Sequence, residues 1–409
     1  MNAVVETGLH ACEAPDAAPT AATWLQVLTD IHPRYGGVSA AVPELSRALR
    51  WSGLDAPIAA LCRADEQTVP WQTEPDQIHF FPRARGAWLP GGRHDADMRE
   101  LMRFCDGAHV HGLWTAASHV ALRAARYAGK PLCVAAHGML EPWSLRQHRF
   151  RKQCYAALIE HRVLRGAACL HALTRSEAES YRAITRDVPV IVVPNGVEVP
   201  GDVAAAHFFA IYPELRDRRI VLFLSRLHPK KAADVLLRAW PRVQAECPDA
   251  HLVIAGAGEP GYELALHALA AAQCARGSVT FTGMLQGRLK WAALCAAECF
   301  VLPSHSEGFS VAILEALGSG TPVIATPQCN MPEIETGQCG WLTEPRKDVL
   351  SDVLRSVLSQ TRSMNAQAGQ RGRDLVLRRY AWSAIARQMA EVYLWLGGAS
   401  LPASVEVLQ

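Results

Sequence analysis

The chain has 409 residues, which is longer than one ordinary compact core and fits two domains of usual size. Half of the residues are hydrophobic, and 41 basic residues against 39 acidic ones leave a net charge of +2. This balance is typical of a globular protein, and so small a charge excludes a general attraction to nucleic acid. The 12 cysteines are scattered and form no CxxC pair, which favours reduced core thiols in a cytoplasmic protein over a zinc site or a disulfide framework.

Residues 1–22 are rich in Ala, Pro and Thr and contain no Lys or Arg, so we expect a disordered leader and not a signal peptide. No later segment has the run of about 18 apolar residues that a membrane-spanning helix needs. We therefore expect a cytoplasmic protein, with at most peripheral contact at the inner face of the membrane.

From Trp24 onward, short apolar runs alternate with longer amphipathic stretches, as in a parallel sheet covered by helices. The strands predicted in the first half are 24–28, 108–112, 132–137, 169–173 and 190–193. A helix is expected to begin near Ser176, where Ser-Glu-Ala-Glu forms a capping box with Glu179 reaching back to the cap. Pro194-Asn195-Gly196 ends the last of these strands, and the next regular pattern starts only around Arg219, so we place the domain boundary between them.

The second half repeats the alternation, with predicted strands at 220–224, 252–255, 279–281, 300–302 and 323–325. The predicted fold class is α/β, with two Rossmann-like doubly wound domains. We expect an N-terminal domain over 23–198, a C-terminal domain over 199–378, a helix over 379–397 that packs across the domains, and a tail over 398–409 with no further strand. In such sheets the ligand lies beyond the carboxyl ends of the strands.

The sharpest segment is a predicted strand, loop and helix with Ser310 at the helix N-cap. Glu307 lies in the loop, and Glu315 lies just over one turn into the helix. Because helical side chains lean toward the N-terminus, both carboxylates are expected to face one crevice. Ionised carboxylates accept hydrogen bonds from the hydroxyls of a ribose or a sugar. A surface helix also carries glutamates for solubility alone, but Gly308 and Phe309 beside Glu307 favour a binding site.

A second segment, Leu224-Ser-Arg-Leu-His-Pro-Lys-Lys-Ala, ends a buried strand at Arg226 and begins a helix near Lys231. Two cations beside a helix N-terminus favour an anion, and a diphosphate is the natural occupant. A solvated loop charge is the alternative, more so for Lys230 than for the other two. Gly36-Gly37, after the first strand, either brings the backbone close to a phosphate or forms a plain turn.

His137 closes a strand that is predicted to be central in its sheet. Its ring either looks into the cleft between the domains or is a hydrogen-bonded core histidine. We expect His109 and His111 to be core histidines.

Together these segments resemble the family-four retaining glycosyltransferases, whose GT-B fold has two Rossmann-like domains facing across a cleft. The resemblance runs from about residue 27 to residue 325 in the family's order, and its most specific part is a pair of glutamates with seven residues between them. The stretches that carry it are Gly36-Gly37, His137-Gly138, Val193-Pro-Asn-Gly-Val, Ser225-Arg-Leu-His-Pro-Lys-Lys, Ala255-Gly-Ala-Gly, Phe281-Thr-Gly, Ser306-Glu-Gly-Phe-Ser through Glu315, and Gly320-Thr-Pro-Val-Ile.

The resemblance implies a role for each matching residue. Glu315 matches the glutamate that binds the ribose and Glu307 the glutamate near the transferred sugar, while His137 matches the histidine that meets this sugar. Arg226 and Lys231 match the pair that holds the diphosphate. The remaining donor-binding positions are Gly36, Gly37, Asn195, Gly256, Gly258 and, through their backbone N–H groups, Gly308, Phe309 and Ser310.

The implied activity is transfer of a sugar, with retention of configuration, from a UDP- or GDP-sugar to a glycan or lipid-linked acceptor. No cofactor and no metal are expected, since Arg226, Lys231 and helix N-termini would stabilise the charge on the leaving phosphate. The D-x-D string at Asp95-Ala-Asp97 does not follow a predicted strand, and we interpret it as chance. The sequence His-Gly-Met-Leu-Glu-Pro-Trp at 137–143 is similar to a subgroup of exopolysaccharide and lipopolysaccharide transferases, which favours bacterial surface polysaccharide synthesis. The family usually has glycine where this chain has Ala232.

Three other classes of protein remain as alternatives. Gly256-Ala-Gly-Glu-Pro-Gly261 fits the dinucleotide fingerprint of an oxidoreductase, but the next predicted strand runs into Thr282-Gly283 and lacks the acidic residue that would hold a ribose. A nucleotide-sugar epimerase or hydrolase on the same scaffold would need no acceptor. A non-catalytic subunit is expected to have lost Glu307 or Lys231.

The stretch 144–165 places Arg and Lys among Leu, Tyr and Ile. It is either a basic amphipathic helix that lies on anionic lipid or an ordinary solvated helix face.

Overall fold

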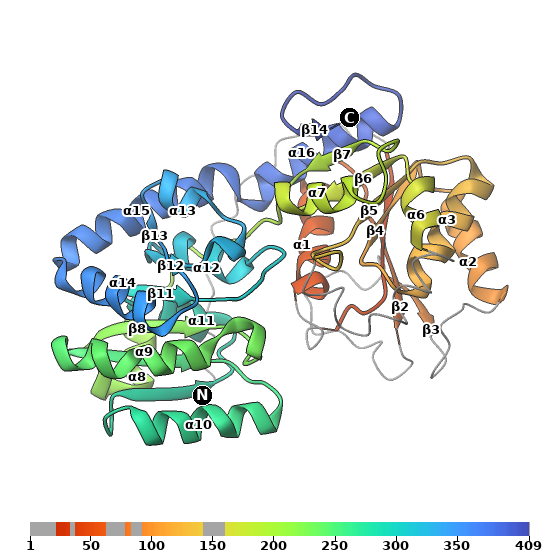
Figure 1. Cartoon of the computed structure of the whole chain (residues 1–409). Coiled ribbons are helices and arrows are strands. Elements are labelled where there is room, and N and C mark those ends of the chain that lie inside the picture. The colour runs from red at the N-terminus through yellow and green to blue at the C-terminus, as the bar shows by residue number, and fades with distance from the viewer. Residues whose placement is uncertain (1–21, 33–36, 63–77, 83–91, 142–159, 409) are drawn as a thin grey trace, which may run out of the picture.

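The computed structural model describes residues 22–32, 37–62, 78–82, 92–141 and 160–408. Gly36, most of the expected leader and residues 144–159 of the basic stretch lie outside these ranges. The described residues form two lobes, each a sheet with helices on its faces (Figure 1). This is the predicted fold class.

Among the described residues, the sheet of the N-terminal lobe has eight strands in the order β14-β7-β6-β5-β4-β1-β2-β3, all parallel except β14. The strands are β1 (Trp24–Leu28), β2 (Ile58–Cys62), β3 (Ile78–Pro82), β4 (Gly107–His111), β5 (Leu132–Ala135), β6 (Cys169–Ala172), β7 (Val190–Val192) and β14 (Glu406–Leu408). The helices are α1 (Gly37–Trp51), α2 (Gly92–Met102), α3 (Ala116–Ala128), α6 (His161–Gly166), α7 (Arg175–Arg182) and α16 (Trp382–Leu396). Separate hydrophobic clusters fill the two faces of this sheet, as expected for parallel strands buried on both sides.

The sheet of the C-terminal lobe is fully parallel, in the order β10-β9-β8-β11-β12-β13. Its strands are β8 (Arg219–Leu224), β9 (Ala250–Ala255), β10 (Val279–Gly283), β11 (Cys299–Leu302), β12 (Val323–Ala325) and β13 (Gly340–Leu342). Its α-helices are α8 (Ala206–Ile211), α9 (Ala233–Glu246), α10 (Pro260–Gln273), α11 (Gly287–Ala296), α12 (Val311–Gly318), α13 (Glu333–Thr336), α14 (Lys347–Ser359) and α15 (Arg362–Arg379), and 3₁₀ turns lie at Pro213–Leu215, Pro229–Lys231 and Pro327–Cys329.

The C-terminal segment differs from the sequence prediction. Helix α16 packs into the N-terminal lobe, because Trp382, Met389 and Tyr393 join the core of that lobe, where the Tyr393 ring stacks on Trp24 at 4.2 Å. The expected tail is wrong, since β14 pairs antiparallel with β7. The physical reason is that β7 would otherwise end the sheet with unpaired N–H and C=O groups.

The two chain segments that cross between the lobes are paired with each other. The backbone N–H of Val197 donates to the carbonyl of Tyr380 at 2.8 Å, and Val197 forms a parallel bridge with Ala381. The lobes are therefore joined by a double connection and not by a single linker. Within the described ranges, no helix is both long and apolar enough to cross a membrane.

Candidate active site

The two lobes meet where the turn after β5 faces the loop between β11 and α12. Glu141, at the end of the turn, is 6% exposed. Its carboxylate accepts hydrogen bonds from Ser306 Oγ at 2.7 Å and from Asn330 Nδ2 at 3.2 Å, both of the C-terminal lobe. Asn330 also donates to the carbonyl of Glu307 at 2.6 Å, so the contact between the lobes also fixes the backbone at the predicted site.

Two glycines bring the backbones of the two lobes close together. A Cβ atom added to Gly138 would lie 2.9 Å from Gly308 Cα, and one added to Gly308 would lie 2.8 Å from Gly138 Cα. Neither position has room for a side chain. Of the backbone N–H groups predicted to meet the sugar, the one at Gly308 therefore lies at this junction.

The turn that carries His137 has a left-handed backbone, with φ of 52° at His137 and 75° at Gly138. Glu177 of α7 holds this turn, because its carboxylate accepts from the N–H of Gly138 at 2.6 Å and from the N–H of Leu173 at 2.7 Å. The capping box predicted at Ser176 is wrong. The N-cap is Thr174, whose hydroxyl accepts from the N–H of Glu177 at 3.2 Å, two residues earlier than the pattern indicated.

Glu307 and Lys231 form a largely buried ion pair. Lys231 Nζ lies 2.5 Å from Glu307 Oε1, which also accepts from Ser304 Oγ at 2.7 Å. Lys231 ends the 3₁₀ turn Pro229–Lys231, and α9 begins two residues later than predicted, after Ala232 with φ of 55°. Glycine adopts a positive φ without a steric penalty, so this backbone gives a physical reason for the glycine that the resembling family has there.

Glu315 pairs with a residue that the sequence did not single out. Lys290 Nζ of α11 lies 2.6 Å from Glu315 Oε1, and the two side chains line a cavity of about 390 Å³ together with Gly37. A Cβ atom on Gly37 would meet nothing within 4 Å, so this end of α1 is open. The two glutamates, which were expected to face one crevice, are therefore held by different lysines.

The loop after β8 gathers positive charge. Arg226 is exposed, and burial together with the charges of Arg226, Lys230 and Lys231 lowers the pKa of His228, while Glu259 raises it. These side chains therefore share one electropositive neighbourhood. Such a cluster suits an anion that carries several oxygens, which agrees with the diphosphate predicted for Arg226 and Lys231.

The glycines after β9 have a packing role. Cβ atoms on Gly256 and Gly258 would lie 1.9 Å from the carbonyl oxygen of Ser225 and 2.0 Å from that of Leu227. They let one loop lie directly on the next, so their predicted donor contact stays a prediction. Asn195 lies on the first crossing segment, and its neighbours Pro194 and Gly196 line two different cavities.

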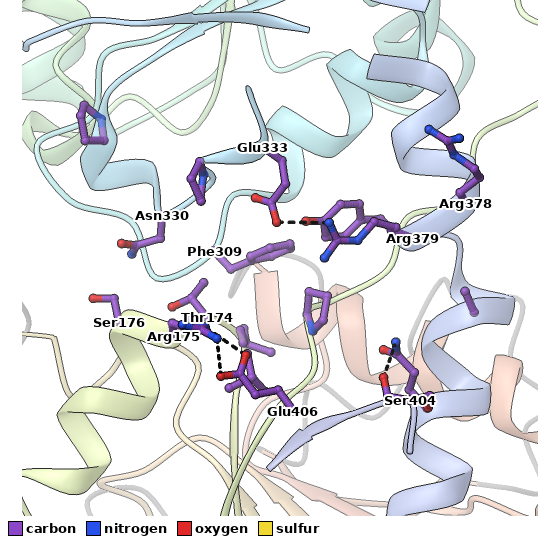
Figure 2. Close-up of a pocket in the computed structure, with 18 residues that line it drawn as sticks. Thr174, Arg175, Ser176, Phe309, Asn330, Glu333, Arg378, Arg379, Ser404 and Glu406 are labelled. Carbon is purple, nitrogen blue, oxygen red and sulfur yellow. Dashed lines mark hydrogen bonds and ion pairs between the residues drawn. The ribbon is translucent and has the colours of Figure 1, made fainter. Parts of the chain in front are cut away.

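The larger of these cavities, of about 660 Å³, lies between the lobes beside α7, α15 and β14 (Figure 2). Among the described site residues predicted from the sequence, only Phe309 lines it. Two of the arginines that line it form ion pairs, with Arg175 2.8 Å from Glu406 and Arg379 3.7 Å from Glu333. This cavity is separate from the Glu307–Lys231 pair.

His137 has a neutral ring. Burial, followed by the neighbouring His171, lowers the pKa of His137 to about 3, so at neutral pH the ring can form hydrogen bonds but carries no charge. Its Nε2 atom lies 3.0 Å from Nδ1 of His111. His109 and His111 are buried, as expected of core histidines.

Among the described residues, no three or more His, Cys, Asp or Glu side chains are grouped so that they could hold a metal ion. Asp95 lies in α2 and pairs with Arg123 at 3.1 Å. The expectation that the reaction needs neither metal nor cofactor stays a prediction.

Two Rossmann-like lobes that meet beside the Lys231–Glu307 pair and a basic loop have the arrangement of the GT-B glycosyltransferases. A model described as "Glycosyl transferase 4-like domain" matches residues 36–196, and one described as "Glycosyl transferases group 1" matches residues 218–360. The chain belongs to this glycosyltransferase family.

A curated relative and two solved structures extend the comparison. A GDP-mannose-dependent alpha-(1-6)-phosphatidylinositol monomannoside mannosyltransferase of Mycobacterium tuberculosis is 29% identical over 398 residues, covering 90% of this chain and 97% of that protein. The structure of Anabaena Alr3699/HepE with UDP and glucose aligns with a TM-score of 0.73 at 19% identity, covering 91% of this chain and all of the other. A putative UDP-N-acetylglucosamine 2-epimerase from Listeria monocytogenes aligns with a TM-score of 0.63 at 17% identity, covering 93% and 98%. The two structural matches show the shared fold alone.

Proposed function

We propose that this glycosyltransferase moves a hexose from a nucleoside diphosphate sugar to a lipid-linked or glycan acceptor in bacterial surface glycolipid or polysaccharide synthesis. The GDP-mannose dependence printed for the mannosyltransferase relative makes GDP-mannose the first donor to test, with UDP-sugars second. The observation that carries the proposal is the Lys231–Glu307 pair, which lies next to the basic loop and at the contact between the lobes.

The proposed mechanism is electrostatic. Lys231 and Arg226 stabilise the charge that grows on the leaving diphosphate, and they act in a site held rigid before reaction. Lys231 and Ser304 both bind Oε1 of Glu307, which leaves Oε2 to accept hydroxyls of the sugar. Glu315 accepts hydroxyls of the ribose next to Lys290.

We further propose that configuration is retained by same-face displacement, in which the leaving phosphate takes the proton of the acceptor hydroxyl. Glu307 then binds the sugar and is not a nucleophile. Trapping of a covalent sugar on Glu307 would contradict this step.

The test is to incubate the purified chain with GDP-mannose, UDP-glucose and an ADP-sugar, each with and without a lipid-linked acceptor, and to measure nucleoside diphosphate release. A transferase releases the diphosphate only slowly until the acceptor is added. Acceptor-independent turnover would support the alternative of a hydrolase or epimerase on the same scaffold. The product's anomeric configuration, measured by NMR, tests retention.

Lys231→Ala is the informative variant, and Lys347→Ala is its matched control. Lys347 is an exposed lysine at the start of α14. The proposal requires turnover to be lost in the first variant and kept in the second.

The peripheral membrane contact suggested by residues 144–165 rests on the sequence alone. Flotation with liposomes that contain or lack anionic lipid tests it. Equal flotation with both kinds of liposome would contradict an electrostatic attachment.

A further inference from the structure

A hydrogen-bonded network of buried polar side chains, a chain of contacts from residue to residue, runs through the N-terminal lobe beneath His137. Its members come from β1, β4, β6 and α16, and none is more than 3% exposed. They are Gln26, His109, His111, His171 and Tyr393. Buried groups of this kind are stable only when each donor faces an acceptor, so the distances between them fix where the protons lie.

The half of the chain nearest the site starts from a backbone carbonyl. One terminal atom of Gln26 lies 3.0 Å from the carbonyl oxygen of Trp24, so it is the amide nitrogen, which donates. The other terminal atom is then the oxygen, and it accepts from Nε2 of His111 at 3.0 Å. With its proton on Nε2, a neutral His111 has only a lone pair on Nδ1, and His137 Nε2 must donate to it at 3.0 Å.

The half of the network farther from the site starts from a different carbonyl, that of Val193. Its hydrogen-bond donors and acceptors can be assigned in the same way. His171 Nε2 donates to the carbonyl oxygen of Val193 at 2.7 Å, so its Nδ1 accepts from Nε2 of His109 at 3.2 Å. Nδ1 of His109 then accepts from the hydroxyl of Tyr393 at 2.8 Å. The Tyr393 oxygen is left to accept from the amide nitrogen of Gln26 at 3.3 Å, and the amide oxygen of Gln26 lies 3.4 Å from the same hydroxyl. The Trp24 carbonyl therefore fixes the orientation of the Gln26 amide, and the contacts of Tyr393 are compatible with it.

The histidine rings in this hydrogen-bonded network are neutral. Burial lowers the pKa of His171 to about 4 and moves those of His109 and His111 well below their usual value, with smaller contributions from neighbouring histidines for the latter two. At physiological pH each ring carries one proton, and the hydrogen-bond directions hold.

We propose that Gln26 and His111 hold the ring of His137 as the tautomer with its proton on Nε2, so that Nδ1 is kept as the acceptor for a hydroxyl of the donor sugar. Nδ1 has no hydrogen-bond partner among the residues that the structure describes. The sugar contact rests on the proposed function, whereas the tautomer does not. Gln26 and His111 are positioning residues, since they act through His137.

The first experiment measures the tautomer directly in the full chain without substrate. Long-range ¹H–¹⁵N correlation spectra of protein labelled with ¹⁵N-histidine distinguish protonated from unprotonated ring nitrogens, and the spectrum of His137→Ala assigns the signals. The expected result is a neutral His137 with its proton on Nε2. A proton on Nδ1, or a charged ring, would overturn the proposal.

Three variants then separate positioning from packing. Gln26→Met keeps the length of the side chain but removes the amide, so His111 can turn its proton toward His137 and the tautomer is no longer fixed. His111→Leu removes the acceptor, and His111→Asn restores one, because the asparagine oxygen takes the place of Nδ1. The control is Tyr393→Phe, which removes a buried hydroxyl from the far half but leaves Gln26 bonded to the Trp24 carbonyl.

We expect Gln26→Met and His111→Leu to lower kcat/KM for the nucleotide sugar by roughly threefold to tenfold, the worth of one neutral hydrogen bond. His111→Asn should recover most of this loss, and Tyr393→Phe should stay within about twofold of wild type. Free nucleoside diphosphate should bind all four with unchanged affinity, because His137 is proposed to meet only the sugar.

Equal losses in Gln26→Met and Tyr393→Phe would show a purely structural role and overturn the proposal, as would identical behaviour of His111→Leu and His111→Asn. If wild-type protein turns over no nucleotide sugar, the proposed function fails, and the ring-nitrogen spectra of these variants still decide the tautomer.

Discussion

The contact between Gly138 and Gly308 permits a steric test of whether the lobes must close for catalysis. In Gly308→Ala, the new methyl carbon would lie 2.8 Å from Gly138 Cα. Carbon atoms in contact normally stay about 3.5 to 4.0 Å apart, so the backbones must separate by about 1 Å. The φ of Gly308 is not positive, and the substitution therefore adds no backbone strain of its own.

A displacement of about 1 Å at a catalytic junction can cost on the order of a hundredfold in rate. We therefore expect kcat/KM of Gly308→Ala to fall by about that factor. The unfolding temperature of each lobe should stay unchanged, because the contact joins lobes that have separate cores.

The assay is steady-state transfer to acceptor, paired with calorimetric unfolding. Gly261→Ala is the matched control, since it adds a methyl group at an exposed position near the start of α10 where nothing lies within 4 Å. Wild-type kcat/KM in Gly308→Ala would refute the reasoning, and so would an equal loss in Gly261→Ala.

Three further predictions concern charged side chains. Lys231→Ala should lower kcat by about a hundredfold or more, because it removes a donor to the leaving group, and single-turnover kinetics measure this loss. It should also lower the unfolding temperature, measured by calorimetry, because the buried Glu307 carboxylate loses its cationic partner. Glu315→Gln should weaken binding of free nucleoside diphosphate by about tenfold in isothermal titration while leaving the sugar end of the site intact; unchanged affinity would argue against ribose binding there. Burial raises the pKa of Glu160 from 4.5 to about 7, so the folded protein keeps a proton that the unfolded chain has released, and the resulting stability is present below pH 4.5 and lost as the pH rises through 7. Urea unfolding measures this effect: between pH 5 and pH 8, the free energy of unfolding should fall less in Glu160→Gln than in wild type.

The sequence predicted the central strands and the loops that follow them because those strands are apolar runs with clear turn signals at their ends. The run at 24–28 coincides with β1, and the loop and helix that carry Glu307 and Glu315 lie as expected. Strands β2 and β3 were not found: Ile58–Cys62 is alanine-rich and has a β-branched residue only at Ile58, and Ile78–Pro82 is an edge strand with an exposed histidine. Such segments carry little periodicity.

The partners of the site residues could not be predicted because they lie on other elements. Nothing in α11 distinguishes Lys290 from a surface lysine until α11 packs near α12. Glu141 stood within a stretch that drew attention only through its resemblance to other transferases. The sequence did carry a signal that His109 and His111 belong to one network, since residues two apart on a strand point to the same side of the sheet. Both rings contact the same network of buried polar side chains.

The return of α16 and β14 to the first lobe makes that lobe discontinuous in the sequence. Its hydrophobic core lacks Trp382, Met389 and Tyr393, and its strand β7 lacks a second neighbour, until β14 has been synthesised. The C-terminal lobe is continuous and can fold on the ribosome first. A shortened chain that ends near residue 380 would therefore expose one face of the N-terminal lobe, and this lobe can complete its core only after the whole C-terminal lobe has been synthesised.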